Sequence, residues 1–339
     1  MLEHGGNLLA AARRYNIPAE EWLDLSTGIN PRGWPVPTAS AASWQRLPHD
    51  QDGLHELACT YYGAKQCMAV AGSQAAIHTL PRLRRQGRIG MLVPSYAEHA
   101  HAWQQQGHHL VPLHAADIDA HVAQLDVLLL VNPNNPTGER FDIEQLLNWQ
   151  QALAQGGGWL IVDEAFMDST PEHSLARYTD RAGLIVLRSV GKFFGLAGAR
   201  CGFVLAEQAL LQQLQELIGP WSVSGPTREV VQLALADSDW QQATRQALSI
   251  QSQRLTALLH RHGLTPHGVT SLFLFLWLRH ARAWELYEAF ARRGILLRHF
   301  SEPQSLRFGL PAFEHEWQRL EQALAEVMPA IQTAEQACL

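Results

Sequence analysis

The chain has 339 residues, of which 47% are hydrophobic and 17% charged, and its formal net charge at pH 7 is -6. This length and composition allow a large buried core, whereas an acidic balance without any long basic run argues against a nucleic-acid-binding or membrane-surface protein. The sequence opens without a secretory signal pattern and contains no apolar run of bilayer-spanning length, so we expect a cytoplasmic protein.

The first 45 residues predict an irregular arm with one short helical patch. It opens with His4-Gly-Gly-Asn7, and the stretch Asp24-Leu-Ser-Thr-Gly-Ile-Asn30-Pro31 leads into a proline-rich run that ends at Pro37. A segment of this composition gains order only by packing against another part of the chain. We therefore predict that residues 1–45 form an arm that belongs to a smaller domain.

The middle of the chain, residues 46–236, predicts alternating strands and helices. Short apolar runs indicate the strands, and patterns with a period near 3.6 residues indicate the helices. Strands are expected at 68–71, 88–93, 109–113, 126–131, 158–163, 184–188 and 202–205, and helices at 54–62, 73–86, 97–107, 142–155 and about 207–236. Pro81 must distort the second of these helices. The alternation predicts an α/β fold with a mostly parallel central sheet, and residues 46–236 form its large domain.

The remaining residues, 237–339, predict a small C-terminal α+β domain. A long helical pattern extends over about 238–262 and is followed by shorter elements. These are strands at 272–277, 294–298 and 305–308, and helices at 281–293 and 313–330. Their mixed order is typical of an α+β unit.

The segment from Ser189 to Arg200, SVGKFFGLAGAR, contains one of only two lysines among 26 basic residues. A lysine amine with a depressed pKa can condense with an aldehyde, which an arginine cannot do. Ser189 and Arg200 could bind a phosphate on the same molecule. The pattern favours a lysine that holds a cofactor aldehyde, although a lone loop lysine is usually a solvated side chain.

This segment resembles the lysine loop of the class I and II aminotransferases, which are fold-type I pyridoxal 5'-phosphate (PLP) enzymes. The resemblance implies PLP as the cofactor and Lys192 as the residue that binds its aldehyde. It also implies that Ser189 and Arg200 bind the cofactor phosphate, and that the protein is a homodimer.

A second anion site is indicated by Gly72, Ser73 and Gln74, which stand where a strand turns into a helix. Backbone N–H groups at a helix start, beside a serine hydroxyl, can bind an anion, and glycine allows close approach. An ordinary serine N-cap is the alternative. The resemblance places the cofactor phosphate here as well.

Three further residues follow apolar strands, at the sheet edge where open α/β sheets bind ligands. By resemblance, Tyr96 stacks on the pyridine ring and Asn135 donates to its phenolate oxygen. Asp163 faces the pyridine nitrogen, where a carboxylate keeps the ring protonated and able to accept electrons. Strand alternation places Glu164 on the opposite face from Asp163.

Two positions depart from the family pattern. Relatives often have a tyrosine where Phe166 stands, and Phe166 cannot donate a hydrogen bond to the cofactor. Relatives also commonly have a tyrosine in place of Leu47, which reaches the cofactor phosphate of the other subunit. The expectation of a shared dimeric site therefore depends on the general resemblance.

The candidate substrate residues are His4, Asn30, Arg298 and Arg307. Guanidinium groups suit carboxylate or phosphate recognition, although surface ion pairs are the alternative. The His-Gly-Gly opening and the Ser-Thr-Gly-Ile-Asn-Pro stretch look like the L-threonine-O-3-phosphate decarboxylase branch of the family, where the arm folds over the substrate. By that resemblance Arg307 binds the carboxylate, while Arg298 and His4 bind the phosphate. The alternative for Asn30 is that it only initiates a turn.

The resemblance implies PLP-dependent decarboxylation of L-threonine O-3-phosphate to (R)-1-amino-2-propanol O-2-phosphate in cobalamin biosynthesis. Two alternatives stay open. One is a histidinol-phosphate-type aminotransferase, and the other is a PLP-fold subunit of a biosynthetic complex that has little activity alone. No metal is indicated, because Cys59, Cys67, Cys201 and Cys338 lack zinc-site spacing and suggest reduced thiols.

Overall fold

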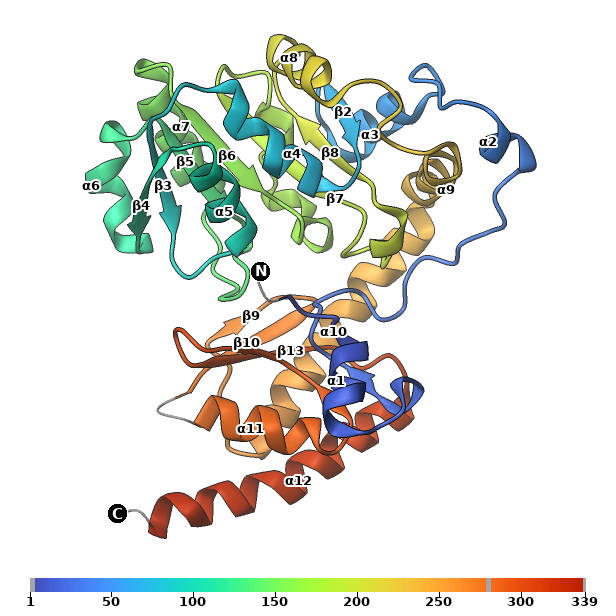
Figure 1. Ribbon diagram of the computed structural model, residues 1–339, viewed down its shortest axis with the longest axis vertical. Helices are drawn as coiled ribbons and strands as arrows, with labels where there is room; N and C mark the ends of the chain where they lie inside the picture. The colour runs from blue at the N-terminus through green and yellow to red at the C-terminus, as the bar shows by residue number, and fades with distance from the viewer. Residues whose placement is uncertain (1–3, 279–281, 338–339) are drawn as a thin grey trace. The chain divides into compact units, whose positions relative to one another are not determined.

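The computed structural model describes residues 4–278 and 282–337, and the chain divides into two compact units (Figure 1). Unit 1 comprises the chain up to Arg32, Pro136–Gly138 and the chain from Arg245 onward, and unit 2 comprises Gly33–Asn135 and Glu139–Thr244. The expected domain boundaries were at 45 and 236. Residues 33–45 fall in unit 2, where the Trp34 amide donates to the Phe194 carbonyl at 2.8 Å and the Ser40 hydroxyl to Glu229 at 2.8 Å.

Unit 2 is built around a seven-stranded sheet of order β2-β8-β7-β6-β5-β3-β4. Its strands are β2 (Cys67–Val70), β3 (Arg88–Leu92), β4 (His109–Leu113), β5 (Val127–Val131), β6 (Trp159–Asp163), β7 (Leu184–Ser189) and β8 (Gly202–Leu205). β8 is antiparallel to both of its neighbours, β2 and β7, and the other pairings in this sheet are parallel. The predicted α/β fold with a mostly parallel sheet is confirmed.

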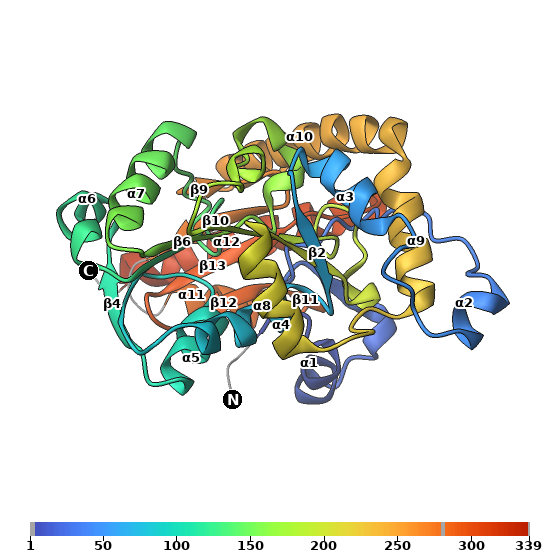
Figure 2. The same ribbon diagram turned by 90° about the horizontal axis from the view of Figure 1, so that it is seen from above.

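Helices cover both faces of this sheet (Figure 2). On one face, α4 (Ser73–Thr79), α5 (Ala97–Gln105) and α8 (Gln208–Ile218) contribute Ile77, Trp103 and Leu214 to a buried cluster with strand residues. The remaining helices of unit 2 are α2 (Ala41–Gln45), α3 (Leu54–Tyr62), α6 (Ile118–His121), α7 (Ile143–Gln155) and α9 (Gly225–Ala236). As Pro81 predicts, α4 ends early and continues as a 3-10 turn, Leu80–Leu83. The helices expected over about 207–236 are α8 and α9, and Gly219-Pro220 lies in the loop between them.

Register places the site-bearing strand ends next to one another. Val131 of β5 lies opposite Asp163 of β6, and Asp163 lies opposite Leu187 of β7. Because these strands are parallel, the loops that follow them leave the sheet at the same edge. Residues far apart in the sequence are thereby collected at one place.

Unit 1 contains a four-stranded antiparallel sheet of order β12-β13-β10-β9. Its strands are β9 (Gly268–Val269), β10 (Phe273–Trp277), β12 (Arg298–Phe300) and β13 (Ser305–Gly309), and β1 (Leu23–Asp24) pairs in parallel with β11 (Ile295–Leu296). The helices are α1 (Leu8–Tyr15), α10 (Ser238–Arg261), which contains the boundary between the units, α11 (Arg282–Ala291) and α12 (Glu314–Ala337). The first residue of the helix expected at 281–293 lies outside the described residues, as does Cys338.

In the part of the chain that the structure describes, no helix is both long enough and apolar enough to cross a lipid bilayer.

Candidate active site

One cavity in unit 2 brings together all nine residues expected to bind the cofactor. They come from the ends of five strands and from the loops and helix starts that follow them. The residues are Gly72, Ser73, Gln74, Tyr96, Asn135, Asp163, Ser189, Lys192 and Arg200. Ala165, Phe166 and Gly191 complete most of the wall.

One end of this cavity is a cradle suited to an anion. Gly72 has a φ of +70°, and a Cβ there would lie 2.7 Å from Nη2 of Arg200, so only glycine fits. Arg200 itself is in the left-handed region with a φ of +50°, a conformation that is costly for a side chain of this size. Ser73 begins α4, where the first N–H groups have no acceptor within the helix. Guanidinium, hydroxyl and amide donors therefore converge where a phosphate could bind.

Lys192 lies on a loop that is anchored by buried aromatic rings. Phe193 and Phe194 are fully buried and pack against Trp240, with ring centroids 5.5 and 5.6 Å from it. The Lys192 amine lies 5.5 Å from the centroid of the Phe166 ring, on the cavity wall. The lysine is thus held at the cavity by neighbours that cannot move without exposing apolar surface.

The Asp163 carboxylate is buried and is held through both oxygens. Oδ1 accepts a hydrogen bond from the Ala165 amide at 3.0 Å. Oδ2 lies 2.9 Å from Nε2 of His99, which is equally buried on α5. An ionised Asp163 therefore has fixed partners and a fixed orientation, as a residue facing a pyridine nitrogen requires.

Tyr96 and Asn135 lie on the loops after β3 and β5. Burial raises the pKa of Tyr96 to about 12, with the charges of Asp163 and Glu98 adding to the effect, so its ring is neutral at physiological pH. Its hydroxyl donates to Gln74 at 3.4 Å, at the limit of a hydrogen bond. The loop before Asn135 is held by hydrogen bonds, including one from the Phe141 amide to the Asn132 side chain at 3.0 Å.

A second cavity, of about 720 Å³, lies in unit 1 and contains two of the four expected substrate residues, His4 and Arg298. The glycines of the arm are required at its edge. A Cβ on Gly5 would lie 2.3 Å from the Ser26 carbonyl oxygen, and the Gly6 amide donates to the Ser26 hydroxyl at 2.7 Å. Aromatic side chains of α11, Trp284 and Tyr287, form part of the wall.

Arg307 is buried beside this cavity and lies directly opposite Arg298 in the pairing of β12 with β13. Its Nη2 donates to the Ser26 carbonyl at 2.6 Å. Burial, followed by the positive charge of Arg298, lowers the pKa of Arg307 to about 9. The two opposed arginines repel each other, and the charge of Asp24 offsets this only in part, so the pair suits an anionic ligand.

Asn30 does not line either cavity. Its side-chain oxygen accepts a hydrogen bond from the Arg32 amide at 2.9 Å, which is the geometry of a turn. The structure thus contains a turn at Asn30, which was the alternative interpretation of this residue. A role of Asn30 in substrate binding stays a prediction.

Two buried residues next to the site, His99 and Arg188, were not predicted from the sequence. His99 stands one helical turn after Tyr96, and that spacing was the available signal. Arg188 immediately precedes Ser189 and carries a charge inside an apolar strand, which is an unusual position for arginine.

The residues present fit PLP. A side chain at position 72 would enter the anion cradle, and the donors around the cradle suit a phosphate. The buried Asp163 carboxylate lies in the same cavity as Lys192. A dinucleotide would need a glycine-rich spacing that the chain lacks.

Comparisons with known proteins agree with this description. The family model for aminotransferase class I and II matches residues 46–326. The chain is 56% identical to the threonine-phosphate decarboxylase of Pseudomonas aeruginosa, covering 96% of this chain and 97% of that protein. It is 39% identical to the threonine-phosphate decarboxylase of a Sinorhizobium species, covering 96% and 98%. The crystal structure of histidinol-phosphate aminotransferase from Sinorhizobium meliloti with pyridoxal-5'-phosphate superposes with a TM-score of 0.85 at 20% identity, over 97% of this chain and 96% of that one.

Proposed function

The chain belongs to the aminotransferase class I and II family, and within it we propose that the protein is a PLP-dependent decarboxylase acting on L-threonine O-3-phosphate. The products are carbon dioxide and (R)-1-amino-2-propanol O-2-phosphate, an intermediate of cobalamin biosynthesis. The observation that carries the cofactor assignment is the single cavity containing Lys192, Asp163 and the Gly72 cradle. The substrate assignment is supported by 56% identity to a threonine-phosphate decarboxylase over nearly the full length of both chains.

In this proposal the residues of unit 2 hold the cofactor. Ser73, Ser189 and Arg200 would bind its phosphate, Asn135 would donate to its phenolate oxygen, and the Tyr96 ring would stack on the pyridine ring. Asp163 would keep the proton on the pyridine nitrogen. When bound, PLP supplies an electron-accepting ring that stabilises the charge left on the substrate Cα when a bond to it breaks.

The residues of unit 1 bind the substrate's two anions. Arg307 binds the carboxylate, and Arg298 with His4 binds the phosphate. The carboxylate leaves as carbon dioxide with its bond electrons remaining on Cα, and a proton delivered to Cα completes the reaction. Lys192 is the proposed carrier of that proton. The arginine anchors decide which Cα bond is aligned for cleavage, and so decide between decarboxylation and transamination.

The test is carbon dioxide release from threonine phosphate by purified protein with PLP and no 2-oxoacid, with Lys192→Ala as the blank. We expect release from the wild type only, together with loss of the visible absorbance of the lysine-bound cofactor in the variant. Turnover that depends strictly on 2-oxoglutarate would favour the aminotransferase alternative instead. Turnover that appears only when a second protein is added would favour the partner-dependent subunit.

We also propose that the protein is a homodimer and works in the cytoplasm. Unit 2 exposes large apolar side chains on and beside α2, with Trp44 72% and Leu47 68% exposed, and Leu233 of the adjacent α9 is 47% exposed. A second copy of the chain could cover this surface. Three described cysteines are free thiols, which suits a reducing compartment.

A further inference from the structure

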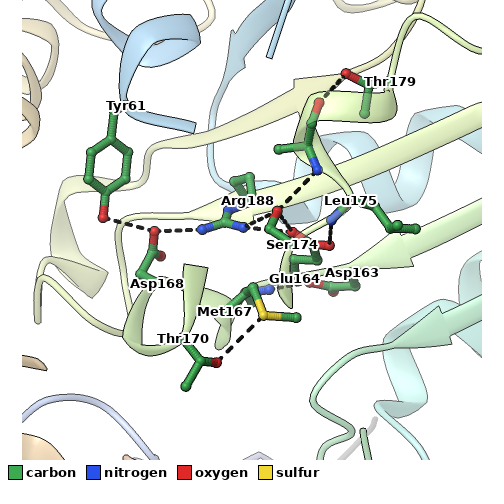
Figure 3. Close-up of polar contacts among 12 residues, drawn as sticks. Tyr61, Asp163, Glu164, Met167, Asp168, Thr170, Ser174, Leu175, Thr179 and Arg188 are labelled. Atoms are coloured by element: carbon green, nitrogen blue, oxygen red, sulfur yellow. Dashed lines mark hydrogen bonds and ion pairs between the residues drawn. The ribbon is translucent and has the colours of Figure 1, made fainter. Parts of the chain in front are cut away.

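A buried ionic network, which the proposed mechanism does not use, lies next in the chain to residues that line the cofactor cavity (Figure 3). Its centre is Arg188 of β7, which is 1% exposed, and its two carboxylates, Glu164 and Asp168, are fully buried. Burying an arginine and two carboxylates in an apolar sheet is expensive unless each charge is paired and hydrogen-bonded. A buried ion-pair network is therefore weak evidence for a purely stabilising role, and a second role is worth testing.

The guanidinium forks between the two carboxylates. Nη1 donates to Glu164 Oε2 at 2.6 Å, and Nη2 donates to Asp168 Oδ1 at 2.7 Å. Burial alone would lower the pKa of Arg188, but the charges of Asp168 and Glu164 outweigh burial and raise it above its ordinary value. Arg188 is therefore a permanent cation at any physiological pH.

Neutral donors complete the network from two other segments. The Leu175 amide donates to Glu164 Oε1 at 2.8 Å, and the Ser174 hydroxyl donates to Glu164 Oε2. The Tyr61 hydroxyl, from α3, donates to Asp168 at 3.1 Å. The network thus ties β6, β7, α3 and the 174–175 segment together.

The residues that the network holds are the immediate neighbours of the proposed catalytic ones. Glu164 follows Asp163, and Asp168 lies in the short turn Met167–Ser169. Between them, the Ala165 amide donates to the Asp163 carboxylate and the Phe166 ring faces Lys192. Because side chains alternate along a strand, Asp163 and Glu164 point to opposite faces of the sheet. His99 holds Asp163 from one face, and Arg188 holds the chain just after it from the other.

We propose that Arg188 is a positioning residue of the cofactor site, whose bridge between Glu164 and Asp168 fixes the 164–168 turn and through it the Asp163 carboxylate and the Phe166 wall. The inference rests on the proposed PLP-dependent function. Without Arg188, two buried carboxylates would lie close together with no counter-charge. They would have to bind protons or draw water into the sheet, and either change displaces the turn.

The experiment compares Arg188→Met with Arg228→Met. Arg228 is an equally buried arginine of unit 2, 3% exposed, and it binds Asp52 through two hydrogen bonds of 2.6 Å. Neither Arg228 nor Asp52 lines the cofactor cavity. Each variant removes a buried arginine from its ion pairs, so both proteins should unfold at lower temperature. Only the loss of Arg188 should alter cofactor binding.

Two readouts report on the cofactor without any substrate. One is the Kd for PLP, measured by titrating the apoprotein, and the other is the pH midpoint of the visible absorbance of the bound cofactor. We expect Arg188→Met to raise the Kd about tenfold or more and to shift the midpoint, and Arg228→Met to change the Kd less than about twofold. Arg188→Lys keeps the charge but cannot reach both carboxylates as a fork, so it should restore only part of the affinity.

A folded Arg188→Met protein with wild-type Kd and midpoint would overturn the proposal, and so would equal effects in the two variants. If Arg188→Met does not fold, Asp168→Asn and Arg188→Lys carry the same test, because the first keeps the side-chain shape, the second keeps the positive charge, and each removes one ionic contact. A wild type that binds PLP but releases no carbon dioxide would contradict the proposed substrate while leaving these readouts measurable.

Discussion

Nε2 of His99 lies 2.9 Å from Oδ2 of Asp163, with both side chains almost completely buried. The second Asp163 oxygen accepts the Ala165 amide, so neither carboxylate oxygen is free to rotate. With Asp163 ionised, the His99 ring nitrogen is the donor. This pair fixes the carboxylate that the proposed mechanism places against the pyridine nitrogen, and it does so from the helix that also carries Tyr96 at its start.

Replacing His99 by phenylalanine should weaken cofactor binding. The ring shape is kept, but a buried carboxylate oxygen loses its donor, at a cost of about 1–3 kcal/mol. We expect the Kd for PLP to rise about tenfold, measured by titration of the apoprotein. His101→Gln is the control, because His101 lies on the same helix and is exposed. An unchanged Kd in His99→Phe would show that the Ala165 amide alone orients Asp163.

Replacing Arg307 by methionine should stabilise the ligand-free protein and abolish substrate binding. The folded pKa of Arg307, about 9, lies below the ordinary value because burial and Arg298 disfavour the cation. Burying the charged Arg307 therefore lowers the free energy of unfolding by its full amount below pH 9. This loss disappears as the pH rises from 9 toward the ordinary pKa, because Arg307 then becomes neutral in the folded protein. We expect the Tm of Arg307→Met to exceed that of the wild type by a few degrees at pH 7.5 and the difference to shrink at pH 10.

Thermal unfolding at the two pH values checks this, with Arg254→Met as the control. Arg254 is a surface residue of the same unit, ion-paired with Glu314, and its replacement should give no such pH-dependent gain. Adding threonine phosphate should raise the Tm of the wild type but not that of Arg307→Met. A variant that is less stable than the wild type at pH 7.5 would contradict the argument.

Introducing a hydroxyl with Phe166→Tyr should lower the pH midpoint of the cofactor's visible absorbance. Phe166 lines the cavity with Lys192, and its ring offers the proposed phenolate oxygen no donor. A tyrosine hydroxyl would share the charge of that oxygen and so make the neighbouring protonated lysine nitrogen less favourable. We expect a decrease of about one pH unit, measured by absorbance titration. Phe166→Leu, which adds no donor, should leave the midpoint near the wild-type value.

The sequence predicted the sheet of unit 2 and the composition of its cavity because the informative residues follow apolar strands directly. It could not predict the partners of those residues. His99 meets Asp163, and Arg188 meets Asp168, only because α5 and the 164–168 turn pack where they do. The sequence also could not show where the N-terminal part of the chain passes into unit 2. Trp34 and Ser40 are held there by hydrogen bonds to Phe194 and Glu229, which are about 160 and 189 positions away in the sequence. Two-residue strands such as β9 are too short to leave a pattern.

Changing Leu47 to glutamate should separate the proposed homodimer into monomers. Trp44 of α2 and Leu47 just after it are largely exposed in unit 2, and large apolar side chains are rarely left in water this close together without a partner. Burying a carboxylate against a second copy of the chain would cost far more than burying leucine gains. Sedimentation equilibrium should give twice the chain mass for the wild type and the single chain mass for Leu47→Glu. Val269→Glu is the control, because Val269 is an exposed apolar residue of unit 1, and it should leave the wild-type mass unchanged. A wild type that sediments as a monomer would refute the assignment of this surface.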